Sequence, residues 1–78
     1  MTINDVIREH ESMGSTVARL GAVRLPEGYA VMWNCDGTHA YWVCEDGRQS
    51  VEHWDKLAVV RGIINDRERR LGEGGTSG

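Results

Sequence analysis

The fold is decided by residues 29–52, which read YAVMWNCDGTHAYWVCEDGRQSVE. Three runs in this stretch are rich in β-branched and aromatic residues, namely 29–34, 40–44 and 49–52. That composition favours β-strands. The pairs Asp36-Gly37 and Asp46-Gly47 divide the runs, and an Asp-Gly pair between two strands is typical of a tight hairpin turn. The stretch therefore predicts a three-stranded antiparallel β-meander.

Two-residue turns at the Asp-Gly pairs also predict a register. Val31 lies opposite Trp42, and Trp42 lies opposite Val51. Because side chains alternate along a strand, one face carries Tyr29, Val31, Trp33, Trp42, Cys44 and Val51. The other carries Ala30, Met32, Asn34, His39, Tyr41, Val43, Ser50 and Glu52. The first face is the expected core face, and residues 22–25 could add a fourth, edge strand.

Helical spacing of apolar residues flanks the meander on both sides. The first helix is expected over residues 3–13, with a possible extension to Leu20, and Thr2 with Asp5 forms a loose capping box. The second is expected from Trp54 to about Arg70. Its apolar stripe consists of Leu57, Val60, Ile64 and Leu71, widened by Val59 and Ile63. Residues 72–78 read as a flexible glycine-rich tail. We therefore expect one α+β domain over residues 1–71, with the second helix packed on one sheet face.

Composition limits the class of protein. Seventy-eight residues, 40% of them apolar, suffice for one small core and not for two domains. No run approaches the roughly 18 apolar residues of a membrane span, and the N-terminus lacks the pattern of a signal peptide. Two cysteines without an export signal fit a reducing compartment. A cytoplasmic protein that does not bind membranes is expected.

Catalytic and metal-binding patterns are weak. Cys35, His39, Cys44 and His53 are possible ligands, but their spacing matches no common zinc pattern. Cys44 and His53 would lie about 13 Å apart along the sheet, too far for a working nucleophile–base pair. The adjacent acids Glu45 and Asp46 fall on a turn, where water gives no reason for a raised pKa. We expect a protein that is not an enzyme and carries no cofactor or metal.

Charge is unevenly distributed in a chain of net charge −3. Residues 27–55 hold six carboxylates against Arg48 alone, whereas residues 56–71 are net basic. The acidic segment predicts a partner-binding surface of Glu27, Asp36, Glu45, Asp46, Glu52 and Asp55. Met32 and Tyr41 on the second sheet face would supply apolar anchors. The expected partner is a protein or nucleoprotein complex with a basic surface, bound without direct contact to nucleic acid.

Two alternatives remain open at this point. Residues 25–54, which begin Leu-Pro-Glu-Gly-Tyr and contain Tyr41-Trp42, resemble a WW domain. That resemblance implies a peptide-binding module that uses the sheet aromatics. Trp54 stands about two residues late for that family, and no proline follows it. The other alternative is a small DNA-binding regulator that uses the cluster Arg67, Arg69 and Arg70.

The whole chain resembles small phage-encoded inhibitors of the anti-CRISPR type in size, acidic charge and predicted architecture. The resemblance rests on no diagnostic motif. It implies a non-catalytic protein that docks through its acidic surface onto a basic, nucleic-acid-binding surface of a host complex. The location would then be the cytosol of the host cell. The oligomeric state, the partner and the exposed sheet face are left open.

Overall fold

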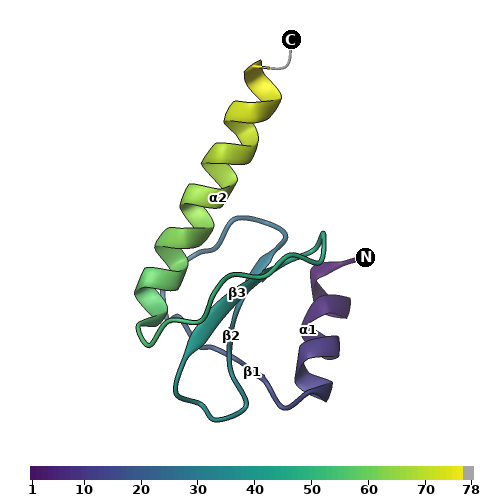
Figure 1. Cartoon of the computed structure of the whole chain (residues 1–78), viewed down its shortest axis with the longest axis vertical. Helices are drawn as coiled ribbons and strands as arrows, with labels where there is room; N and C mark the ends of the chain where they lie inside the picture. Colours follow the sequence, from purple (N-terminus) through teal and green to yellow (C-terminus); the bar gives the residue numbers. More distant parts are fainter. Residues whose placement is uncertain (77–78) are drawn as a thin grey trace.

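Two helices cover opposite faces of a three-stranded antiparallel sheet in the computed structural model, which describes residues 1–76 (Figure 1). The elements are α1 (Ile3–Ser12), β1 (Thr16–Val17), β2 (Tyr29–Trp33), β3 (Ala40–Cys44) and α2 (Lys56–Thr76), and the strand order is β1-β2-β3. The α+β prediction is confirmed. The edge strand, however, is β1 and not the predicted residues 22–25.

Helix α1 begins as its sequence predicts. The Thr2 hydroxyl accepts a hydrogen bond from the Asp5 N–H, and the Asp5 carboxylate accepts one from the Thr2 N–H, which completes a capping box. The helix ends at Ser12, and Gly14 then turns the chain with a φ of +99°, a conformation that glycine adopts at little cost. Helix does not continue to Leu20, because the chain passes directly into β1.

The β2–β3 hairpin has the predicted register. Val31 lies opposite Trp42, and Trp33 lies opposite Ala40. The loop is longer than two residues, because the Asn34 N–H donates to the His39 carbonyl and closes a loop over residues 35–38. Gly37 takes the only positive φ in that loop, +71°. Since the loop is extended equally on both sides of the Asp-Gly pair, the strand pairing is unchanged.

The second hairpin differs from the prediction by one residue. The Cys44 N–H donates to the Arg48 carbonyl, so the loop holds the three residues 45–47, with Gly47 at a φ of +91°. Three-residue loops of this kind place a residue with positive φ at their end. Val43 is consequently bridged to Gln49. Trp42 therefore does not face Val51 as predicted.

The chain returns to the predicted register four residues later through a bulge. Ala40 is bridged to His53, so residues 50–52 accommodate one extra residue. The Ser50 hydroxyl accepts the Trp42 N–H at 2.9 Å and donates to the Val51 carbonyl. Val51 therefore lies on the surface and is 87% exposed. Residues 49–52 are therefore an irregular edge segment and not the predicted third strand.

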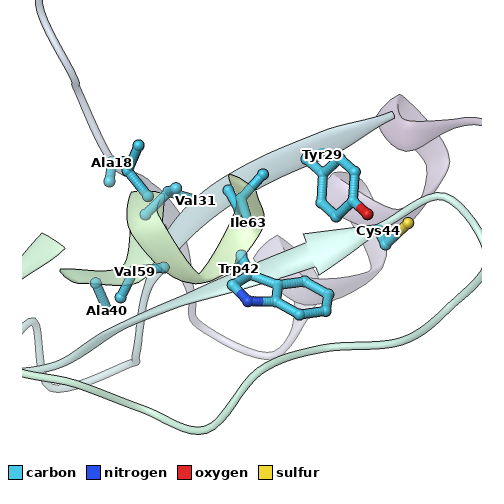
Figure 2. Packing of buried hydrophobic residues seen from close by; sticks show 9 residues of the cluster. Ala18, Tyr29, Val31, Ala40, Trp42, Cys44, Val59 and Ile63 are labelled. Carbon is cyan, nitrogen blue, oxygen red and sulfur yellow. The ribbon is translucent and has the colours of Figure 1, made fainter. Parts of the chain in front are cut away.

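Both sheet faces are buried, each under one helix. Beneath α2, Figure 2 shows Val31 and Trp42 of the sheet close to Ile63 of the helix, and Tyr29 and Val59 belong to the same buried cluster. The opposite face forms a second cluster beneath α1, made of Val6, Ala30, Met32, Tyr41 and Val43. The predicted core face is confirmed except at Val51, and the second face, expected to be half polar, is a core as well.

Helix α2 packs on the sheet through a narrower face than predicted. Val59, Val60 and Ile63 are buried, whereas Leu57, Ile64 and Leu71 of the predicted stripe are 49%, 46% and 61% exposed. Leu71 is exposed because the C-terminal part of α2 extends past the sheet (Figure 1). Gly62 permits a close approach, since a Cβ there would lie 3.3 Å from the Trp42 Nε1.

The predicted glycine-rich tail, residues 72–78, includes the last residues of α2. The backbone of α2 stays helical to Thr76, and Ser77 and Gly78 lie outside the described residues. Over the part of the chain that is described, no helix is both long enough and apolar enough to cross a membrane.

Candidate protein-binding surface

The six predicted carboxylates separate into two groups at opposite ends of the sheet. Glu27 precedes β2 at the end where Tyr29 pairs with Cys44, and Glu45 and Asp46 follow β3 at that end. Asp36, Glu52 and Asp55 belong to the other end, where Trp33 pairs with Ala40. The two ends of a five-residue strand are about 13 Å apart. The carboxylates therefore do not form one continuous acidic surface.

Asp46 is neutralised by arginines. Its carboxylate accepts hydrogen bonds from the Arg48 side-chain Nε at 2.7 Å and from the Arg48 backbone N–H at 3.0 Å. The guanidinium of Arg70 lies 3.9 Å from the same carboxylate. Burial opposes ionisation of Asp46, but the hydrogen bonds from Arg48 outweigh it, so the pKa of Asp46 is lowered. The pKa of Asp46 is therefore not raised, as expected, although its carboxylate is bound by Arg48 and not by water alone.

Arg48 also connects this turn to a buried carboxylate on α2 that sequence reasoning missed. Asp66 is 3% exposed. Its carboxylate accepts hydrogen bonds from both Nη atoms of Arg48 at 2.9 Å, from the Tyr29 hydroxyl at 2.6 Å and from the Arg69 guanidinium at 2.9 Å. The hydrogen bonds from Arg48 lower the pKa of Asp66 to about 2 in spite of burial. Burial, together with the hydrogen bond to Asp66, raises the pKa of Tyr29.

A sequence signal for Asp66 was present. It lies three residues after Ile63 and seven after Val59, so it falls on the apolar stripe of α2. A carboxylate at such a position needs buried donors, and a tyrosine and arginines supply them. Both carboxylate oxygens of Asp66 accept hydrogen bonds, and through Arg48 the cluster ties the 45–48 turn to α2.

The remaining charged side chains at the end of the sheet where Tyr29 pairs with Cys44 are of both signs. A hollow of about 310 Å³ lies between the sheet end and α2, lined by Glu27, Tyr29, Glu45, Arg67, Arg70 and Leu71. Glutamates therefore face arginines across it, and this end does not present a surface of one sign. The same observation weakens the DNA-binding alternative, because Arg69 and Arg70 also contact Asp66, Tyr29 and Asp46.

The opposite end keeps its negative charge. Asp36, Glu52 and Asp55 form no ion pair within 4.0 Å across residues 1–76. Glu52 lies 3.4 Å from the Asn34 amide nitrogen, two residues before Asp36, and Asp55 caps the start of α2 through the Leu57 N–H at 3.0 Å. We refer to Asp36, Glu52 and Asp55 as the acidic end.

Large apolar side chains are exposed next to these carboxylates. Val51 is 87% exposed, Trp54 72% and Leu57 49%. The Trp54 ring is stacked on His53, with 5.6 Å between ring centroids and an interplanar angle of 25°. Trp54 was expected to begin α2, and its exposure was not predicted. The segment 51–57 therefore combines apolar anchors with unpaired carboxylates.

The two predicted apolar anchors are not on the surface. Met32 is 0% exposed and Tyr41 4%, because α1 covers their face of the sheet. The Tyr41 hydroxyl is hydrogen-bonded to the His10 Nδ1 at 2.8 Å and donates to the Ser15 hydroxyl at 2.7 Å. With Trp42 also buried, the sheet aromatics on which WW-like peptide binding would depend are covered by helices.

The possible metal ligands are dispersed. Cys35 is exposed in the β2–β3 loop, Cys44 is buried at the far end of β3, and both thiols are free. Among the side chains of residues 1–72, no group of three or more from histidine, cysteine, aspartate and glutamate is arranged to hold a metal ion.

Comparisons with known proteins identify no relative of the chain. No protein-family model matches the chain, and neither a curated protein nor a solved structure matches it.

Proposed function

We propose that the protein is a non-catalytic binding protein that docks through the acidic end onto a basic surface of a partner. The observation that carries the proposal is the combination of three unpaired carboxylates with the exposed Trp54 and Val51 in one part of the surface. Tryptophan is enriched among the residues that dominate binding energy in interfaces. Carboxylates that form no internal ion pair attract a basic surface and accelerate association with it.

The biological setting we propose is that of a phage-type inhibitor, similar in kind to anti-CRISPR proteins. An acidic protein that covers a basic, nucleic-acid-binding surface competes with the nucleic acid and needs no catalytic group. The small size, the net charge of −3 and the acidic end support this setting. Its partner would be a host protein or nucleoprotein complex, and its place of action the host cytosol.

Affinity capture from a bacterial lysate tests the proposal with a variant that lacks the three charges of the acidic end, called the acidic-end variant below. The variant carries Asp36→Asn, Glu52→Gln and Asp55→Asn, which removes three charges and preserves the cap of α2, since asparagine caps as well as aspartate does. We expect the native protein to retain a basic partner that the variant loses. Association with that partner should be about tenfold slower for the variant and should slow further as salt rises.

A matched control removes the same number of charges elsewhere, at Glu9, Glu11 and Glu68, which are all exposed. The Glu→Gln triple variant at these positions should capture the partner as the native protein does. Equal capture by the acidic-end variant, or association rates that do not respond to salt, would show that the acidic end is not the docking surface.

A further inference from the structure

The outer edge of the irregular segment 49–52 has open hydrogen-bonding groups. The segment runs beside β3 at the edge of the sheet, joined to it by isolated bridges at Gln49 and His53. Among the described residues, the backbone N–H groups of Gln49, Val51 and Glu52 have no hydrogen-bond partner. All three residues are exposed. An edge of this kind can pair with an extended segment of another chain.

Hollows flank this edge on both sides of the sheet. On the α2 side, a hollow of about 200 Å³ is lined mainly by apolar groups, among them Trp42, Val51, Val59 and Gly62. That volume is below the roughly 300 Å³ at which small-molecule pockets begin, and it suits a single apolar side chain.

The hollow on the α1 side is larger, and both polar and apolar groups line it. It measures about 350 Å³ and includes Asn34, Gln49 and the carboxylate-bearing Glu52. Glu52 forms no ion pair across residues 1–76. A basic side chain that enters this hollow would meet the carboxylate of Glu52 within the acidic end.

We infer that the edge segment 49–52 binds an extended, basic segment of the partner by strand addition. Successive side chains of a strand point to opposite faces of the sheet. A segment that pairs with this edge therefore directs one side chain into the apolar hollow and the next into the larger hollow, where Glu52 lies. The sequence that fits alternates apolar and basic residues. This inference rests on the proposed function and specifies the chemistry of the partner at the docking surface.

A defined probe tests the pairing directly. The probe is a fluorescein-labelled peptide Gly-Lys-Val-Lys-Val-Lys-Gly, and fluorescence anisotropy measures its binding to the full-length protein. Three control peptides separate the possible causes of binding. One has the same composition in blocks, Gly-Lys-Lys-Lys-Val-Val-Gly. The other two have the alternating sequence with N-methyl groups on alternate backbone nitrogens, one for each register of pairing.

Strand addition predicts that the alternating peptide binds about tenfold more tightly than the block peptide and than one of the two N-methylated peptides. Val51→Pro removes a backbone donor that has no internal partner, so the fold should persist while binding falls by a similar factor. Val51→Thr keeps the donor and the β-branched shape, and should bind about tenfold more tightly than Val51→Pro. Circular dichroism of both variants checks that they remain folded.

The outcomes distinguish the inference from the function on which it rests. Equal binding of all the peptides, or of Val51→Pro and Val51→Thr, overturns strand addition. If strand addition fails in this way but the acidic-end variant still binds the peptides more weakly than the native protein does, docking by charge remains supported. If the alternating peptide binds the acidic-end variant as tightly as the native protein, the acidic end is not the docking surface. A folded native protein that binds no peptide at about 1 mM, the weak limit of useful affinity, also overturns the inference.

Discussion

The buried Asp66 carboxylate gives a quantitative prediction about stability. Its pKa is lowered from 3.8 to about 2, and each pKa unit corresponds to about 1.4 kcal/mol of preference for the charged form. Ionised Asp66 therefore contributes about 2.5 kcal/mol to the free energy of unfolding at pH 7. Because the pKa in the folded state is depressed, this contribution is complete above about pH 4 and is lost as the pH falls through about 2.

Asp66→Asn tests this contribution with little change of shape. The amide keeps one acceptor, but its NH₂ group faces the guanidinium donors of Arg48, so the variant should lose about 2–4 kcal/mol of stability at pH 7. For a domain of this size the melting temperature should fall by about 10–20 °C. Tyr29→Phe is the milder control, because it removes one hydrogen bond to the ionised carboxylate and should cost about 1.5 kcal/mol.

Urea unfolding followed by tryptophan fluorescence, at pH values from 7 to 2, measures the difference between native protein and variant. The difference should be constant from pH 7 to about 4 and then shrink towards pH 2, as Asp66 becomes protonated in the native protein. A difference below about 0.5 kcal/mol at pH 7, the usual effect of a surface substitution, would refute the reasoning. A difference that does not change between pH 4 and 2 would refute it too.

Two further predictions concern the bulge and the thiols. Ser50→Ala leaves the Trp42 N–H without its acceptor and should cost about 1–3 kcal/mol in urea unfolding, whereas Gln49→Ala should stay within about 0.5 kcal/mol; equal effects would contradict the bridging role of the hydroxyl. In thiol titration with a disulfide reagent, the exposed Cys35 should react rapidly and the buried Cys44 only after denaturation. Two thiols that react equally fast in the native protein would contradict the burial of Cys44.

The elements that sequence predicted well are those with local causes. The capping box at Thr2 and the alternation along residues 29–33 and 40–44 act over a few residues, so α1, β2 and β3 could be placed. The β2–β3 register was also predictable, although its loop is longer than the Asp-Gly rule implies. Its extension is equal on both sides, and the pairing was preserved.

The features that sequence did not predict depend on contacts between distant parts of the chain. Nothing within residues 29–52 indicates that α1 covers the second sheet face. Met32 and Tyr41 were therefore expected on the surface. The two Asp-Gly pairs are identical as dipeptides, yet one lies in a four-residue loop and the other in a three-residue loop. That difference of one residue displaced Val51 from the predicted core to the surface.

The candidate site follows from this displacement. If the second hairpin had the two-residue turn, Val51 would face Trp42 beneath α2 and residues 49–52 would continue the ladder. The three-residue loop offsets Gln49 by one position, and Ser50 supplies through its hydroxyl the acceptor that the ladder lacks. The extra residue then leaves Val51 exposed and frees its N–H. The local departure from regular pairing is thus the same event that creates the open edge beside the acidic end, and bulges are often found next to functional sites for this reason.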